Sequence, residues 1–364
     1  MTDVQDLLSR VRQRDLDREG IPMYLALEGA VPAPAGDSRR AEGRRLARQL
    51  ARVHAELTRV GGPKPPIEPV EPLEEDDEEE RDPEAREPPE YKLLAEAISV
   101  LAYDSLGSGH TAEGGDDERP EEGETAMARQ DGPIGPMLQA LEEGRFIRVV
   151  NYHNTPESSY TQLGEELAGF ADRFAPVNLD AFERFFETGE WPHPRPPLLP
   201  VFYEGYRNGY TVAAPLCEAV GLTAWFFVIT GFVDTPPADQ VDYARHHNIG
   251  LVEEELTQER IALSWDEVAE LARKHVVTSH TGNHQPPAWV RTPEDFEREV
   301  VAPLEAIRRA TGRPSPFHAW LYGSGPGRHL EHDRALGEAG YRYFLSNTAI
   351  AALPHPPQQD QVRR

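Results

Sequence analysis

From about residue 145 onward, apolar residues switch repeatedly between strand-like and helix-like spacing. Short runs rich in β-branched and aromatic residues predict strands at 146–150, 198–203, 223–229, 275–279, 317–322 and 341–345. Apolar positions three and four residues apart predict helices between them, at 163–174, 179–186, 210–220, 264–274, 293–311 and 332–339. Strands that alternate with helices predict a parallel sheet, open or closed into a barrel, and at least six such units in roughly 210 residues suit a barrel-like fold slightly smaller than an average eight-unit one.

The N-terminal third of the chain has a different pattern. Residues 1–60 show amphipathic helical spacing, whereas 61–134 are rich in proline, glycine and acidic residues and include an acidic block at 74–80. Because proline removes backbone donors and like charges repel, we expect a largely disordered linker there, with a short helix near 92–103.

These patterns predict one folded domain behind the linker. A short helix at 136–144 leads into it, so we place the barrel domain at 135–357 and a tail at 358–364. The segment 1–134 offers few apolar groups to the barrel core, and we expect the barrel to fold without it.

The composition restricts the class of partner. The 364 residues carry a net charge of −26, which argues against nucleic acids and anionic membrane surfaces, because both bind basic patches. The N-terminus lacks the basic and apolar regions of a secretory signal, and no run of about 18 apolar residues predicts a membrane span. We therefore expect a cytoplasmic protein. The single cysteine, Cys217, lies in an apolar run and is expected to be a buried thiol.

Polar residues collect where the predicted strands end, which is where parallel α/β folds carry their chemistry. His280 and His284 form an H-x-x-x-H pair directly after one strand, and two imidazoles at this spacing can bind one zinc or similar ion. Glu204 follows another strand and is the best candidate for a third, carboxylate ligand. Water bound to such a metal becomes acidic enough to attack a polarised carbonyl.

Six segments, taken in order, resemble the NodB-homology polysaccharide deacetylases. The matching segments are 149–153, 202–206, 225–231, 279–284, 319–323 and 339–342. The resemblance covers about 145–357 and implies a distorted (β/α) barrel that removes N- or O-acetyl groups from sugars with a divalent metal. It leaves the N-terminal part of the chain unexplained.

The resemblance also implies roles for single residues. The family's metal ligands fall on Glu204, His280 and His284. Its catalytic-base aspartate falls on Tyr203, a departure, because a phenol is a poor proton acceptor at neutral pH. Its late catalytic histidine corresponds to His355, the weakest of these matches.

Further residues at the strand ends are candidates for contact with a carbohydrate substrate. We assign this role to His153, Tyr206, Trp320 and Tyr322.

Two functions remain open. The first is a metal-dependent hydrolase of acetamido or acetyl-ester groups on a sugar or glycan, with Glu204 or a neighbouring group as base. The second is a degenerate barrel that binds a glycan or a partner without turnover. The intact histidine pair favours the first and Tyr203 favours the second. No motif identifies a protein partner for the acidic N-terminal region.

Overall fold

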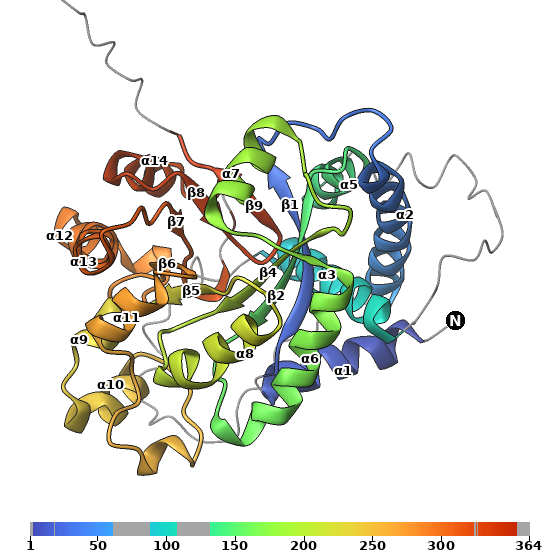
Figure 1. The fold of residues 1–364 in the computed structure, drawn as a ribbon. Coiled ribbons are helices and arrows are strands. Elements are labelled where there is room, and N and C mark those ends of the chain that lie inside the picture. The colour runs from blue at the N-terminus through green and yellow to red at the C-terminus, as the bar shows by residue number, and fades with distance from the viewer. Residues whose placement is uncertain are drawn as a thin grey trace, which may run out of the picture.

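The computed structural model describes residues 3–17, 19–60, 88–107, 132–323, 325 and 327–354. Eight strands form a closed barrel in the order β2-β1-β9-β8-β7-β6-β5-β4, and pairing of β2 with β4 closes the ring (Figure 1). Their bounds are β1 Ile21–Glu28, β2 Phe146–Tyr152, β4 Pro197–Phe202, β5 Trp225–Val228, β6 Val276–Ser279, β7 Phe317–His318, β8 Tyr343–Leu345 and β9 Ala349–Ala352. The short β3, Ala175–Pro176, pairs with the start of β4.

Six of the barrel strands run in one direction and two in the other. β2, β4, β5, β6, β7 and β8 are parallel to one another. β9 is antiparallel to β8, and β1 is parallel to β9 and antiparallel to β2. The carboxyl ends of the six parallel strands therefore meet at one end of the barrel, as the sequence pattern predicts.

The strand β1 corrects our expectation for residues 1–60. This segment forms the helices α1, Val4–Leu16, and α2, Ser38–Arg59, but β1 lies between them and fills the gap between β2 and β9. Leu25 and Leu27 have no exposed surface. Residues 21–27 of this strand are apolar because the strand is covered on both sides, so it lacks the alternation of a half-buried strand. The barrel thus includes a strand from the region that we expected to be dispensable.

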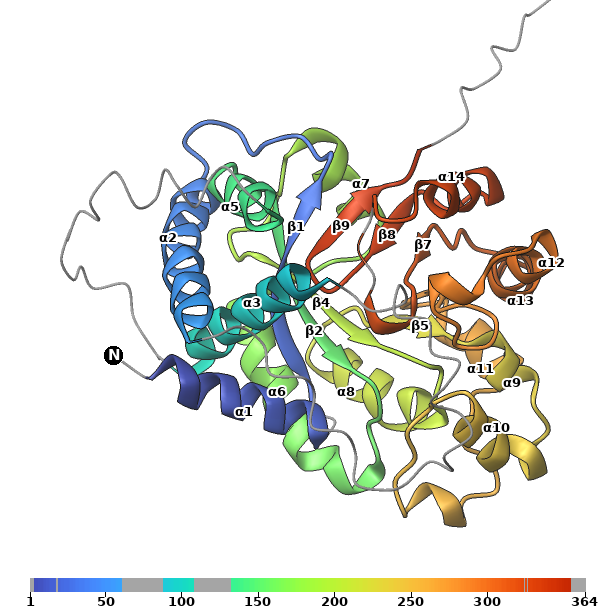
Figure 2. The ribbon, with the colours of Figure 1, turned by 180° about the vertical axis from the view of Figure 1, so that it is seen from behind.

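Helices from the N-terminal part of the chain cover this side of the barrel. α3, Pro89–Gly107, packs on β1, α1 and α2, and α5, Ile134–Glu142, packs on α2 and β1 (Figure 2). α3 confirms the helix expected near 92–103. The rest of the predicted linker, at 61–87 and 108–131, and the end of the chain, 355–364, lie outside the described residues.

The remaining helices lie in or near the predicted ranges, except α9 and α10, which the sequence pattern did not predict. They are α6 Tyr160–Arg173, α7 Leu179–Thr188, α8 Ala214–Ala219, α9 Thr230–Asp234, α10 Gln240–His246, α11 Trp265–Leu271, α12 Pro293–Phe296, α13 Ala302–Thr311 and α14 Leu330–Ala339. A capping box of Ser264 and Glu267 opens α11. The helix predicted at 293–311 is interrupted by a π-helical turn. The strand predicted at 317–322 ends at His318 and is followed by a helical turn at Leu321–Gly323.

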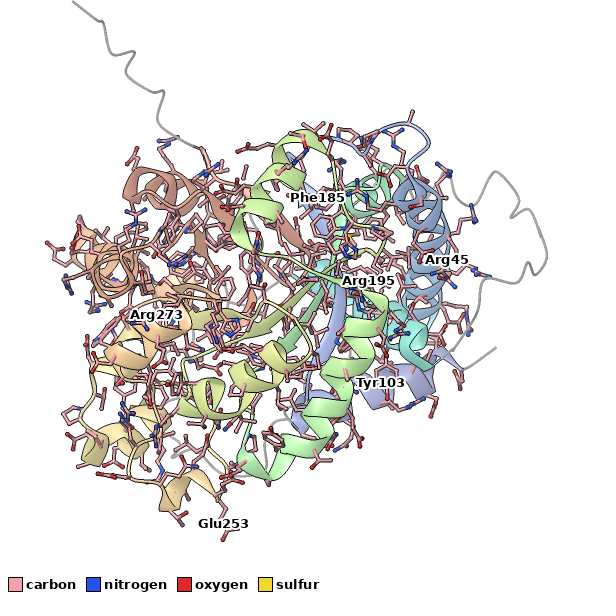
Figure 3. All side chains as sticks on the ribbon, in the orientation of Figure 1. Arg45, Tyr103, Phe185, Arg195, Glu253 and Arg273 are labelled. Carbon is pink, nitrogen blue, oxygen red and sulfur yellow. The ribbon has the colours of Figure 1, made fainter. Side chains whose placement is uncertain are left out.

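Side chains that alternate along the strands pack into two apolar layers, one inside the barrel and one between the barrel and its outer helices. Val201 and Phe227 pack in a cluster shared with β1, β7, β8 and β9, which places them inside the ring. Phe202 and Phe226 pack with α6, α8 and α11 on the outside, where Cys217 is also buried. Glu253 and Arg273, in contrast, are exposed (Figure 3). The barrel interior is therefore a packed core that supports the strand ends.

Shortening a buried side chain of β1 should lower the stability of the barrel. Leu25→Ala removes a fully buried side chain, so we expect a loss of about 2–5 kcal/mol in the free energy of unfolding, measured by urea denaturation. The matched control is Val31→Ala, an exposed residue just after β1, which should change stability by less than about 0.5 kcal/mol. Equal, small effects of both substitutions would show that β1 is no part of the folded barrel.

Candidate metal centre

The predicted ligands meet at the carboxyl ends of two barrel strands. Glu204 lies two residues after β4, His280 directly follows β6, and His284 lies four residues further on. One ligand atom of each residue lies within 4.8 Å of the others, and all three side chains are buried. The structure therefore brings together the two imidazoles and the carboxylate that the sequence singled out.

The backbone around these residues is strained. In the described part of the chain, the non-glycine residues with positive φ are Glu204 (69°), Asn248 (53°), Thr281 (72°), His284 (59°) and Tyr322 (63°). Such conformations cost of order 1–3 kcal/mol each and gather at functional sites, where the surrounding structure holds them. Two of the three proposed ligands, Glu204 and His284, are themselves in this region.

Both imidazoles are oriented by backbone carbonyls. His280 Nδ1 lies 3.0 Å from the carbonyl oxygen of Ala319, and His284 Nδ1 lies 2.7 Å from that of His247. Because a carbonyl only accepts hydrogen bonds, each Nδ1 carries the proton and each Nε2 keeps its lone pair. His284 Nε2 is buried, has no hydrogen-bond partner among the described residues and lies 3.8 Å from Glu204 Oε1.

Burial also sets the charge of the two rings. Desolvation lowers the pKa of His280 well below its usual value, and the neighbouring His284 lowers it further. Desolvation lowers the pKa of His284 as well, against the opposing effect of Glu204. Both rings are therefore neutral at pH 7, which is the form that binds metals.

This donor set fits a divalent metal. Two neutral imidazoles and one carboxylate, with positions left open for other ligands, are a common metal-binding set in proteins. Ligand atoms around a tetrahedral zinc lie about 3.4 Å apart, so a small inward movement of the side chains would complete the coordination.

Tyr203 lies beneath the site and faces the barrel interior. Its ring stacks on His153 at 5.4 Å between centroids and packs against Phe227 and His280 at 5.3 and 5.0 Å. Burial raises the pKa of the phenol, and the charge of Glu204 raises it further. A phenol with a raised pKa stays protonated at neutral pH, so this environment opposes a role for Tyr203 as the base.

The other predicted site residues form two groups, one exposed and one buried. His153 is 43% exposed with its Nε2 3.9 Å from Glu204 Oε1, and Tyr322 is 57% exposed. Tyr206 and Trp320 are buried, contrary to our assignment of substrate contacts. The hydroxyl of Tyr206 donates to Gly250, and Trp320 packs on His318 beneath the surface. His355 lies outside the described residues.

Comparison with known families covers the part of the chain that carries the three proposed ligands. Residues 192–344 match the polysaccharide deacetylase family model. This part of the chain is a polysaccharide deacetylase domain. The matched segment of the deacetylase domain contains Glu204, His280 and His284, whereas β1 and His153 precede it.

Two curated relatives are similar to the chain. The poly-β-1,6-N-acetyl-D-glucosamine N-deacetylase of Escherichia coli strain K12 is 24% identical over 253 residues, which is 59% of this chain and 35% of the relative. The protein of the same name from Escherichia coli O157:H7 is 25% identical over the same shares. The chain thus spans about a third of the length of these relatives.

Among solved structures, the Streptococcus pyogenes deacetylase PplD in complex with acetate aligns with a TM-score of 0.43 and 16% identity. The alignment covers 57% of this chain and 92% of that one. IcaB from Ammonifex degensii aligns with a TM-score of 0.41 and 16% identity, covering 58% and 87%. None of the described helices of the chain is both long and apolar enough to cross a membrane.

Sequence reasoning missed His247, whose carbonyl oxygen receives the Nδ1–H of His284. This residue lies in the loop after α10 and acts through its backbone. A backbone acceptor has no side-chain signature, so no motif could have found it.

Proposed function

We propose that the deacetylase domain is a metal-dependent hydrolase that removes acetyl groups from a carbohydrate, with Glu204, His280 and His284 as the metal ligands. The observation that carries this proposal is the pair of buried, neutral imidazoles whose ligand atoms lie within 4.8 Å of one another and of a Glu204 carboxylate oxygen. The names of the curated relatives favour an N-acetylated amino sugar as the substrate.

We propose zinc as the metal, because imidazole nitrogens and a carboxylate oxygen with open positions suit it. When bound, it would acidify a water molecule and polarise an acetyl carbonyl. His280 and His284 would hold the ion through nitrogens whose direction is set by Ala319 and His247.

Two residues at the mouth of the site would contact the substrate. His153 is partly exposed beside Glu204, and an imidazole in this position can give or take a proton. The exposed ring of Tyr322, on the turn after β7, offers an apolar face to a sugar. Since Tyr203 stays protonated, we assign it to packing under the site and leave proton acceptance to His153 or Glu204.

The alternative function is a degenerate barrel that binds a glycan or a partner without turnover. The observation in its favour is the absence of a carboxylate at position 203, where Tyr203 is buried and remains a phenol. A barrel of this kind could keep its metal ligands and still lack a base.

The metal proposal predicts the content of the purified protein. We expect about one equivalent of divalent metal per chain, and loss of this metal when His280 and His284 are both changed to alanine. The matched control is His246→Ala, an exposed histidine on α10, which should leave the metal content unchanged. Elemental analysis that finds a folded, metal-free wild type would rule out the ligand set.

Substitutions at position 203 distinguish the two functions. If the wild type is an enzyme, Tyr203→Phe should release acetate from an N-acetylglucosamine oligosaccharide at a rate within about twofold, because the hydroxyl accepts no proton. Under the degenerate alternative, the wild type is inert and Tyr203→Asp gains activity. A loss of activity of about 100-fold in Tyr203→Phe would contradict the packing role.

A further inference from the structure

We propose that Glu299 is a positioning residue for the metal centre, which it serves by fixing the loop that carries His284. The inference rests on the proposed metal site, since it assigns a role to a residue that does not touch the ion. Glu299 is a buried carboxylate with 1% of its surface exposed, and the sequence pattern gives it no role beyond a place in an amphipathic helix.

A π-helical turn brings Glu299 to the loop. The helix predicted at 293–311 is split into α12 and α13 by the turn Glu297–Val301, which contains Glu299. A π-turn inserts one extra residue into a helical turn, and such insertions are frequent at functional sites. The register shift breaks the regular helical pattern, so the sequence alone does not show that this carboxylate faces inward.

The carboxylate of Glu299 binds the residue next to His284. Glu299 Oε2 accepts the backbone N–H of Asn283 at 2.7 Å, and Oε1 accepts the side-chain amide of Asn283 at 2.9 Å. Oε1 also accepts from Arg298 Nε at 2.9 Å. The backbone carbonyl of Glu299 accepts the N–H of Gly282 at 3.0 Å. Two consecutive residues of the loop are therefore tied to this one glutamate.

Hydrogen bonds connect Asn283 to His284 through His247. The carbonyl oxygen of Asn283 binds His247 Nδ1 at 2.9 Å, and the carbonyl oxygen of His247 binds His284 Nδ1 at 2.7 Å. On its other side, Asn283 Oδ1 accepts the hydroxyl of Tyr243 at 3.0 Å. The ring of Tyr243 in turn packs on that of His247, with 4.1 Å between centroids. The direction of His284 Nε2 thus depends on a continuous set of contacts that begins at Glu299.

The loop has no room to move toward the helix. A Cβ atom at Gly282 would lie 2.3 Å from the carbonyl oxygen of Arg298, so only glycine fits there. A Cβ at Gly231 would lie 2.5 Å from Asn283 Oδ1. Glu299 therefore holds its two partners in a closely packed position.

A carboxylate is needed because Glu299 faces only donors. Three N–H groups converge on its side chain, and a carboxylate can accept from all of them. A glutamine of the same shape would turn its own amide N–H groups toward one of these donors. His280 should keep its direction in such a variant, because its Nδ1 binds Ala319. The expected defect is a misdirected His284 in a folded barrel.

The test compares Glu299→Gln with Glu297→Gln, an exposed glutamate on the same π-turn. Zinc affinity is measured by competition with a chromophoric chelator, and folding is measured by thermal melting in the presence of EDTA. We expect zinc to bind Glu299→Gln ~10-fold more weakly than the wild type, because loss of a residue that orients a ligand costs about 10–100-fold in affinity. Glu297→Gln should bind zinc within about twofold of the wild type.

Zinc affinity of Glu299→Gln equal to that of the wild type, or an equal loss in Glu297→Gln, would overturn the positioning role. A wild type that binds no zinc would overturn the proposed metal site itself, and this inference with it. If Glu299→Gln shows no cooperative melting, Tyr243→Phe replaces it, since this substitution removes only the hydroxyl that holds Asn283 Oδ1. Weaker zinc binding by a folded Tyr243→Phe variant then supports the series of contacts from Glu299 to His284. Unchanged zinc binding overturns the proposal.

Discussion

Two backbone carbonyls determine which nitrogen of each buried histidine faces the centre of the site. Ala319 and His247 accept the Nδ1 protons of His280 and His284, so the lone pair of each ring is on Nε2, and His284 Nε2 lies 3.8 Å from Glu204 Oε1. If either ring turned over about its Cβ–Cγ bond, the Cε1–H group would take the place of Nε2, and the ring could no longer bind a metal there. The ligand set therefore depends on the chain around the histidines as much as on the histidines themselves.

The barrel supplies the positions of these carbonyls. Ala319 follows β7, and its distance from His280 is set by the pairing of β6 with β7 at Ser279 and His318. The ring closes only because β1 pairs with both β2 and β9. A strand from the start of the chain thus contributes to the geometry of a site whose ligands come from much later in the sequence.

The sequence predicted the parts of the site that follow strand ends. His280 and His284 lie next to a β-branched run, and their burial and convergence on Glu204 agree with the expected barrel. The strand β1 was missed because its apolar run lacks the alternation of a half-buried strand, and because the pairing of Ile21 with Asn151 joins distant parts of the chain. Tyr206 and Trp320 lie at strand ends as expected, but neighbouring segments cover them, and such cover depends on tertiary packing. His247 acts through a backbone atom, so it has no sequence signature. Glu299 faces inward because it lies in a π-turn, which the sequence pattern does not show either.

The most direct test is a crystal structure of the zinc-loaded chain with anomalous data collected at the zinc edge. We predict one strong anomalous peak at the mouth of the barrel, about 2.0–2.2 Å from His280 Nε2, His284 Nε2 and a carboxylate oxygen of Glu204. Bonds from both Nδ1 atoms to the carbonyls should remain. A peak at other residues, or a histidine that binds zinc through Nδ1, would contradict the account.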